Sequence, residues 1–199
     1  AGDGVLTISY FDTLTTLEKR SALAEGHWGF RCCCRRCEAE RALGSAWAAL
    51  QGRVAARVGE LQAAVLASQV QEAREEVNAL VLQVEDWLEG ASVEETTRDW
   101  CRASLAGLYR RQLRGAFPYG QEASALRRRV NRFVEATNPG SLYHLEATFR
   151  HWQSTVASCG GDSRSPEAEA AKEACVKAHR CRYGPVSDDT LLELLRQTE

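Results

Sequence analysis

The chain has 199 residues, of which 44% are hydrophobic and 26% are charged, and its formal net charge is -2. This composition is typical of a globular protein of one or two domains and excludes an intrinsically disordered chain. No apolar run reaches the length of a membrane span or resembles the core of a signal peptide. We therefore expect no membrane partner and a reducing location, the nucleus or the cytoplasm, where the eight cysteines remain thiols.

The predicted elements change in kind once along the chain. Residues 5–11, VLTISYF, are rich in β-branched and aromatic types and follow Gly2-Asp3-Gly4, which predicts a turn and then a strand. After the cysteine-rich stretch at 32–37, apolar residues recur at spacings of three and four, which predicts amphipathic helices. The apolar stripes are Leu43, Trp47, Leu50, Val54 and Val58; Val77, Leu80, Val84, Trp87 and Leu88; Cys101, Leu105 and Leu108; Leu126, Val130 and Phe133; and Leu142, Leu145, Phe149, Trp152 and Val156.

Turn and capping residues separate these stripes. They are Gly90 to Ser92, Pro118 to Gly120, Asn138-Pro139-Gly140 before Ser141, Ser165-Pro166, and Gly184-Pro185 before Ser187. Residues 39–199 are thus predicted to form about seven antiparallel helices. Such an α/α array resembles a tetratricopeptide (TPR-like) layout, although no signature repeats at a fixed period. The expected fold class is mostly α, with a short β segment and a cysteine loop before the helical array.

Charge is distributed unevenly along the helical part. The segment from Glu60 to Glu95 holds nine acidic residues and one arginine, whereas the segment from Arg98 to Arg132 holds nine arginines and two acidic residues. We expect neighbouring antiparallel helices to complement each other's charge. The alternative interpretation, a nucleic-acid or acidic-partner surface at Arg127-Arg128-Arg129 and Arg132, ranks behind it, so a nucleic-acid partner is not expected.

The stretch FRCCCRRC, residues 30–37, carries the clearest chemical signal. Cys32, Cys34 and Cys37 form a C-x-C-x2-C pattern, which lets three thiolates converge on one tetrahedral zinc ion. The fourth ligand would be Cys33, His27, a distant Cys175, His179 or Cys181, or a residue outside this chain. Neighbouring Arg31, Arg35 and Arg36 would favour thiolates. The alternative is a cluster of ordinary reduced thiols without a metal.

Several motifs in residues 2–38 resemble one enzyme family when taken together. They are Leu6-Thr7-Ile8-Ser9-Tyr10-Phe11-Asp12, Thr15 with Glu18 and Arg20, and Phe30, Cys32, Cys34, Arg36 and Cys37. In this order they resemble the end of a SET domain and its post-SET cysteine segment, as found in SET-and-MYND (SMYD-like) protein-lysine methyltransferases. The resemblance divides the chain into residues 1–38, the end of the SET domain with its zinc-binding segment, and residues 39–199, a C-terminal helical domain.

The resemblance implies roles for individual residues. Tyr10 would border the lysine channel and orient the attacking amine, and Ile8 would limit how many methyl groups fit in that channel. Phe30 would stack on the adenine of S-adenosylmethionine. Cys32, Cys34 and Cys37 would bind zinc together with a cysteine from the body of the SET domain. The substrate would be a lysine-containing protein, such as a histone. Without the resemblance, Tyr10 and Phe30 would be an ordinary strand-end tyrosine and a core anchor.

The match to the family pattern is incomplete. Cys33 makes the cysteine cluster contiguous, and Lys19 replaces an arginine of the family helix. The glycine-rich cofactor-binding segment, the Asn-His-Ser-Cys segment and the MYND zinc module of such enzymes are not found in this sequence. We therefore expect the C-terminal portion of a longer methyltransferase that is inactive on its own. The alternative is a helical scaffold without catalysis, whose zinc loop binds protein partners.

Overall fold

The computed structural model describes residues 12–66, 70–115, 121–185 and 187, and these form nine helices without a strand. The helices are α1 (Leu17–Trp28), α2 (Arg35–Ala42), α3 (Gly44–Leu66), α4 (Val70–Gly90), α5 (Glu95–Ser104), α6 (Ala106–Gly115), α7 (Gln121–Thr137), α8 (Leu142–Ser158) and α9 (Pro166–Tyr183). The mostly helical fold class is confirmed. The strand predicted at 5–11 and the helix predicted after Ser187 lie outside the described residues.

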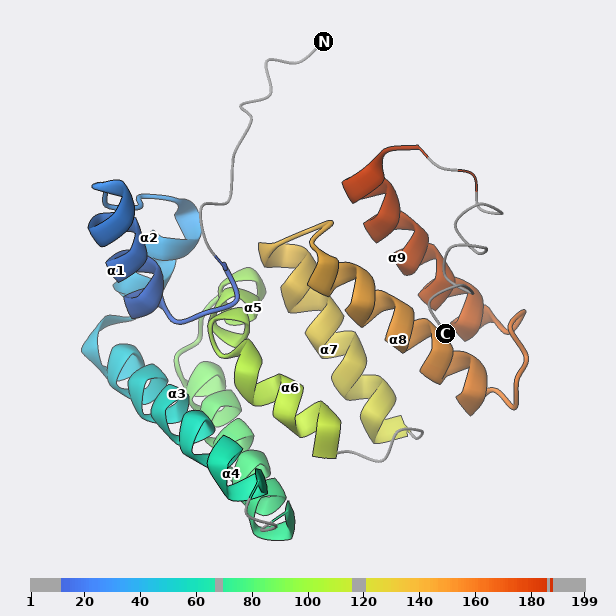
Figure 1. Cartoon of the computed structure of the whole chain (residues 1–199), viewed down its shortest axis with the longest axis horizontal. Helices are drawn as coiled ribbons and strands as arrows, with labels where there is room; N and C mark the ends of the chain where they lie inside the picture. Colours follow the sequence, from blue (N-terminus) through green and yellow to red (C-terminus); the bar gives the residue numbers. More distant parts are fainter. Residues whose placement is uncertain (1–11, 67–69, 116–120, 186, 188–199) are drawn as a thin grey trace.

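The helices follow one another across the molecule (Figure 1). The long pair α3 and α4 packs together, α4 packs on α6, and α7, α8 and α9 continue the array by successive pairwise contacts. The short helices α1 and α2 lie at the opposite end from α9, and α2 packs on α3 and α5. None of the described helices is both long and apolar enough to cross a membrane. A TPR-like arrangement of the array stays a prediction.

Helix ends follow the expected capping chemistry. Ser141 caps α8 by accepting a hydrogen bond from the His144 amide at 3.1 Å. Ser165 caps α9 in the same way, with Pro166 at the first helical position, where a missing amide hydrogen costs nothing. Helix α1 ends at Gly29, whose φ of 67° is the left-handed conformation that favours glycine. These caps set where the chain turns back between helices.

The apolar stripes form the main core of the described part. Trp47, Val54 and Leu88 are almost completely buried, and the rings of Trp47 and Trp87 lie 5.0 Å apart between centroids. One difference concerns the stripe through Cys101 and Leu108, which falls on two helices because the chain bends at Leu105. Both α5 and α6 still bury their halves of the stripe.

Ion pairs between helices confirm the expected charge complementarity for part of the arginine-rich segment. Arg102 of α5 pairs with Glu85 of α4 at 2.8 Å and with Asp99 at 2.9 Å. Arg132 of α7 also reaches Asp99, at 2.9 Å, and Arg129 reaches Glu85 at 3.4 Å. Arg98 pairs with Glu95 at 3.5 Å, so acidic residues neutralise at least four described arginines of the segment from Arg98 to Arg132.

Candidate metal centre

The cysteine loop connects α1 to α2. At the end of α1 the Gly29 amide donates to the Glu25 carbonyl oxygen at 3.2 Å, and the Phe30 amide donates to that of Ala24 at 3.2 Å. This pair of bonds closes the helix and directs the chain into an extended segment. Cys34 has extended backbone angles and precedes the first turn of α2. Cys37 lies three residues later, in that first turn.

The three predicted zinc ligands come together in the structure. The Sγ atoms of Cys32, Cys34 and Cys37 all lie within 4.8 Å of one another. Thiolates bound at about 2.3 Å to one tetrahedral zinc ion stand about 3.8 Å apart, so an inward shift of at most about 1 Å brings the three sulfurs to bonding distance. The donor set therefore fits a metal of the zinc class and supplies three of the four ligands of a closed site.

The three thiols differ in their surroundings. Cys34 is exposed, Cys32 is half-buried and Cys37 is buried. Burial raises the pKa of Cys37 to about 12, and the other two cysteines act in the same direction against the charge of Arg20. Burial also acts to raise the pKa of Cys34, but the neighbouring amides of Cys37 and Arg36 and the thiols of Cys32 and Cys37 lower it below its usual value. Without a metal, then, Cys34 loses its proton more readily than Cys37.

No fourth ligand atom stands beside the triad among the described residues. The triad has no further Cys, His, Asp or Glu within its group in this part of the chain, and Cys33 beside it is exposed. Cys175 and His179 are buried in α9, which lies across the molecule from α1 and α2 (Figure 1). Among the alternatives for the fourth ligand, this arrangement favours a residue outside the described part over Cys33, His27, Cys175, His179 and Cys181.

A buried ion network, which was not predicted from the sequence, fixes α2 behind the triad. The Glu40 side chain is fully buried and its Oε1 accepts hydrogen bonds from both Arg20 of α1 and Arg36 of α2. Its Oε2 accepts from Ser104 Oγ of α5 at 2.7 Å and from Gln51 Nε2 of α3 at 3.3 Å. The carboxylate thereby joins four helices. The spacing of four residues between Arg36 and Glu40 was the available sequence signal.

The network changes the role of one expected residue. Arg31 and Arg35 are exposed, but Arg36 is buried and donates to Glu40, to the Thr13 carbonyl oxygen at 2.7 Å and to Ser104 Oγ at 2.7 Å. It holds α2 against α5 and the segment before α1. Helix α2 itself runs through the predicted boundary between residues 38 and 39.

The remaining predicted site residues have different outcomes. Phe30 lies in the loop two residues before Cys32, and 37% of its surface is exposed. It belongs to neither of the two apolar clusters among the described residues. Tyr10 and Ile8 lie outside the described residues, and their roles stay predictions.

Comparison of the chain with protein-family models, with curated proteins and with solved structures finds no match. The assignment of a function therefore depends on the cysteine triad, its setting and the sequence motifs around it.

Proposed function

We propose that the chain is the C-terminal portion of a SET-domain protein-lysine N-methyltransferase that uses S-adenosylmethionine. The observation that carries the proposal is the convergence of Cys32, Cys34 and Cys37 within 4.8 Å directly after Phe30. The same short stretch thus combines a zinc-type donor set with an exposed aromatic ring. Residues 6–12 supply the accompanying motif with Tyr10, and the chain is incomplete as a catalyst without the rest of the SET domain.

In this proposal zinc is structural. Cys32, Cys34 and Cys37 would hold it together with a fourth thiolate from elsewhere in the enzyme, and zinc would supply a fixed cross-link with no role in the chemistry. The network at Glu40 keeps α2 in place, and α2 carries Cys37. Phe30 then covers one wall of the donor pocket and excludes water, while the Tyr10 hydroxyl orients the lysine amine toward the methyl group.

A second candidate function is a scaffold that binds proteins and performs no catalysis. The observation that favours it is the buried network, because Arg20, Arg36 and Glu40 join the cysteine loop rigidly to the helical array whether or not a cofactor is present. In this case the loop and the array would form one binding surface for a protein partner.

Cofactor binding and methyl transfer distinguish the two functions. The complete protein should bind S-adenosylmethionine in calorimetry and transfer radioactive methyl groups to lysine-containing proteins such as histones. The 199-residue chain alone should transfer none. A complete protein that neither binds the cofactor nor methylates any lysine substrate would be a scaffold. Methyl transfer by the 199-residue chain alone would show that the catalytic unit is smaller than proposed.

A further inference from the structure

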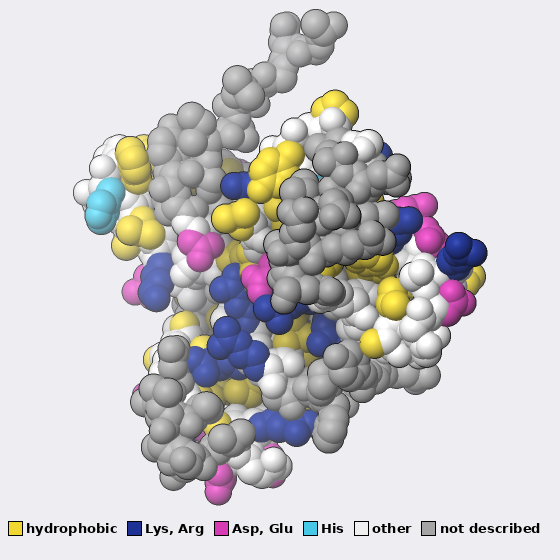
Figure 2. Space-filling model, turned by 45° about the vertical axis from the view of Figure 1, so that its right-hand side comes forward, with side chains coloured by type: hydrophobic (Ala, Val, Ile, Leu, Met, Phe, Trp, Pro, Cys, Tyr) yellow, Lys and Arg dark blue, Asp and Glu magenta, His cyan; other side chains and the backbone are white. Residues whose placement is uncertain are grey.

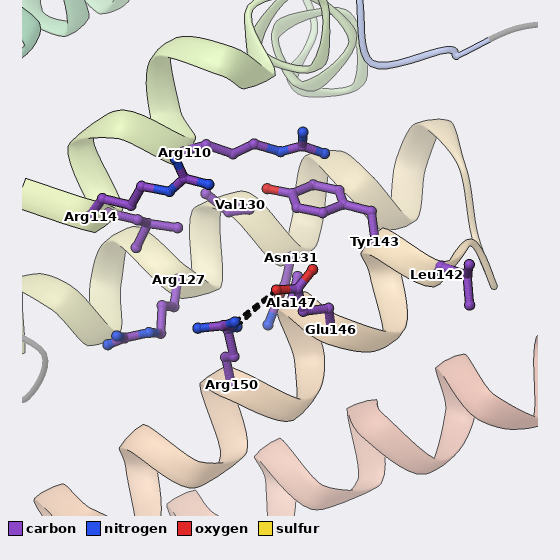
Figure 3. Close-up of a pocket in the computed structure, with 11 residues that line it drawn as sticks. Arg110, Arg114, Arg127, Val130, Asn131, Leu142, Tyr143, Glu146, Ala147 and Arg150 are labelled. Atoms are coloured by element: carbon purple, nitrogen blue, oxygen red, sulfur yellow. Dashed lines mark hydrogen bonds and ion pairs between the residues drawn. The ribbon is translucent and has the colours of Figure 1, made fainter. Parts of the chain in front are cut away.

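Helices α6, α7 and α8 form a groove whose wall is rich in arginine (Figure 3). Arg110 and Arg114 come from α6, Arg127 from α7 and Arg150 from α8, and Glu146 is the acidic side chain among the described lining residues. The groove encloses about 470 Å³. Figure 2 shows Lys and Arg side chains gathered around a hollow on one face of the molecule. Arg110, Arg114 and Arg150 against Glu146 leave a surplus of two positive charges, and Arg127, whose Nη1 donates to Ser154 Oγ at 2.8 Å, lies beside them in the wall.

Fewer arginines of the groove are paired with carboxylates than arginines near the acidic segment from Glu60 to Glu95. Among the described side chains, Arg110 and Arg114 form no ion pair with a carboxylate. Arg150 pairs with Glu146 at 2.9 Å (Figure 3), in an exposed position where such a pair holds weakly. The charge surplus is thus a property of this groove and is not shared by the paired surface around Arg102.

Two buried polar atoms in the groove lack a partner within the protein. They are Nε of Arg110 and Oδ1 of Asn131, and both residues line the groove. The Arg110 guanidinium stacks on the ring of Tyr143, with its Cζ 3.6 Å from the ring centroid, and this contact fixes the arginine side chain in place. An unsatisfied buried donor such as Nε of Arg110 costs free energy, which an anionic oxygen recovers, whereas Oδ1 of Asn131 is an acceptor and does not favour an anionic ligand.

From these features we propose that the groove binds a small molecule that carries two or more phosphate groups. A phosphate group concentrates about −1.5 to −2 charges and three acceptor oxygens on a few atoms. A ligand with two such groups offers one to each of Arg110 and Arg114, which have no carboxylate partner among the described side chains. Carboxylates carry one charge each, and several acidic side chains would have to converge in the same space. Guanidinium groups bind phosphate oxygens in pairs of parallel hydrogen bonds. This site is independent of the cysteine triad and of the proposed methyltransferase function.

The test uses the 199-residue chain and isothermal titration calorimetry with sodium tripolyphosphate and with ATP, both without magnesium. Arg114→Gln should weaken tripolyphosphate binding roughly tenfold or more, because it removes a charged donor at an exposed position without disturbing the core. The matched control is Arg128→Gln. Arg128 is exposed and lies beside Arg127 in sequence, its guanidinium bonds to Ser124, and it does not line the groove, so binding should change less than about twofold.

A second variant has the opposite expected sign. Glu146→Gln removes the groove's carboxylate and should strengthen tripolyphosphate binding by roughly two- to fivefold. Three results would overturn the proposal. They are no heat of binding at millimolar tripolyphosphate or ATP, an equal loss in Arg114→Gln and Arg128→Gln, and tighter binding of a hexaglutamate peptide that depends on Arg114. The last result would assign the groove to acidic peptides.

Discussion

Arg36 and Ser104 are 68 residues apart in the chain, and Arg36 Nη2 donates a hydrogen bond of 2.7 Å to Ser104 Oγ. Arg20 donates to the same oxygen at 2.9 Å, and Ser104 donates in turn to Glu40 at 2.7 Å. A single hydroxyl of α5 is thereby shared by both arginines and their carboxylate partner. The cysteine-bearing end of the chain is thus attached to the helical array through polar groups that are out of contact with water.

The first prediction concerns the stability of this network. Glu40→Gln leaves Arg20 and Arg36 buried without a counter-charge and should lower the free energy of unfolding by about 3–5 kcal/mol. Urea unfolding followed by circular dichroism measures the change. The matched control is Glu38→Gln on an exposed position of the same helix, which should change the free energy by less than about 0.5 kcal/mol. Equal stability of the two variants would mean that the network contributes nothing.

The second prediction tests how the two ends of the chain are coupled. In a chain that begins at Ala39, Glu40 has lost Arg20 and Arg36, so the substitution Glu40→Gln should cost less than about 1 kcal/mol there. The difference between this cost and the cost in the 199-residue chain is the coupling free energy. If Glu40→Gln lowers the free energy of unfolding by as much in the shorter chain, the loss comes from the contacts of Glu40 with Ser104 and Gln51 and not from those with the arginines.

Much of the fold could be predicted from the sequence because local pattern determined it. Val54, Leu88 and Phe133 recur at helical spacing and are buried, and Ser141 and Ser165 cap helices as their positions indicated. The triad could also be predicted, since its residues are close in sequence. The spacing of residues in the sequence does not predict which distant residues become neighbours on folding.

The network at Glu40 and the arginine-rich groove both consist of residues that are distant in sequence and become neighbours on folding. As a charged residue in a helix, Glu40 would be expected to be exposed. Its burial becomes evident only when α1 and α5 are placed beside it. Arg110, Arg127 and Arg150 lie on three helices and become one surface only after those helices pack. The bend at Leu105 was missed for a related reason, because the apolar spacing continues through it and the chain turns without a glycine or a proline.

The third prediction concerns pH. Burial, together with the charges of Arg128 and Arg127, lowers the pKa of His151 to about 4. The neutral ring is therefore favoured in the folded state, and the unfolded state binds more protons between pH 6.5 and pH 4. The stability that the neutral His151 ring contributes to the folded state is fully present above pH 6.5. It is lost as the pH falls from 6.5 to 4.

We expect this group to account for about 2 kcal/mol of lost stability at pH 4, after allowance for partial solvent screening. His151→Leu removes the titrating group, and its Nδ1 has no hydrogen-bond partner to lose. Unfolding free energies at pH 7 and pH 4 should differ less in this variant than in the natural chain. Some acid sensitivity should remain, because burial also lowers the pKa of His144 and His179. An unchanged difference would show that His151 is not responsible.

The fourth prediction concerns the metal. The 199-residue chain should bind zinc weakly, because three thiolates leave the fourth position of a tetrahedral site to water or to an exchangeable ligand. Cys37→Ser should reduce zinc affinity by roughly a hundredfold, whereas Cys33→Ser, the control, should leave it nearly unchanged. Competition with a chromogenic chelator measures both. Tight equimolar zinc in the natural chain would show that the fourth ligand is local, and an equal loss in Cys33→Ser would place that residue in the site.

The fifth prediction tests the roles of Tyr10 and Phe30 in the proposed methyltransferase. Tyr10→Phe keeps the ring and removes the hydroxyl, so the melting temperature should stay nearly constant while methyl transfer falls by about 10²-fold or more, as for the loss of one positioned polar group. Phe30→Ala should instead weaken S-adenosylmethionine binding, because it removes stacking area and opens the donor pocket to water. Full activity of Tyr10→Phe would show that Tyr10 does not orient the substrate in the lysine channel. Unchanged cofactor affinity in Phe30→Ala would show that Phe30 does not line the donor pocket.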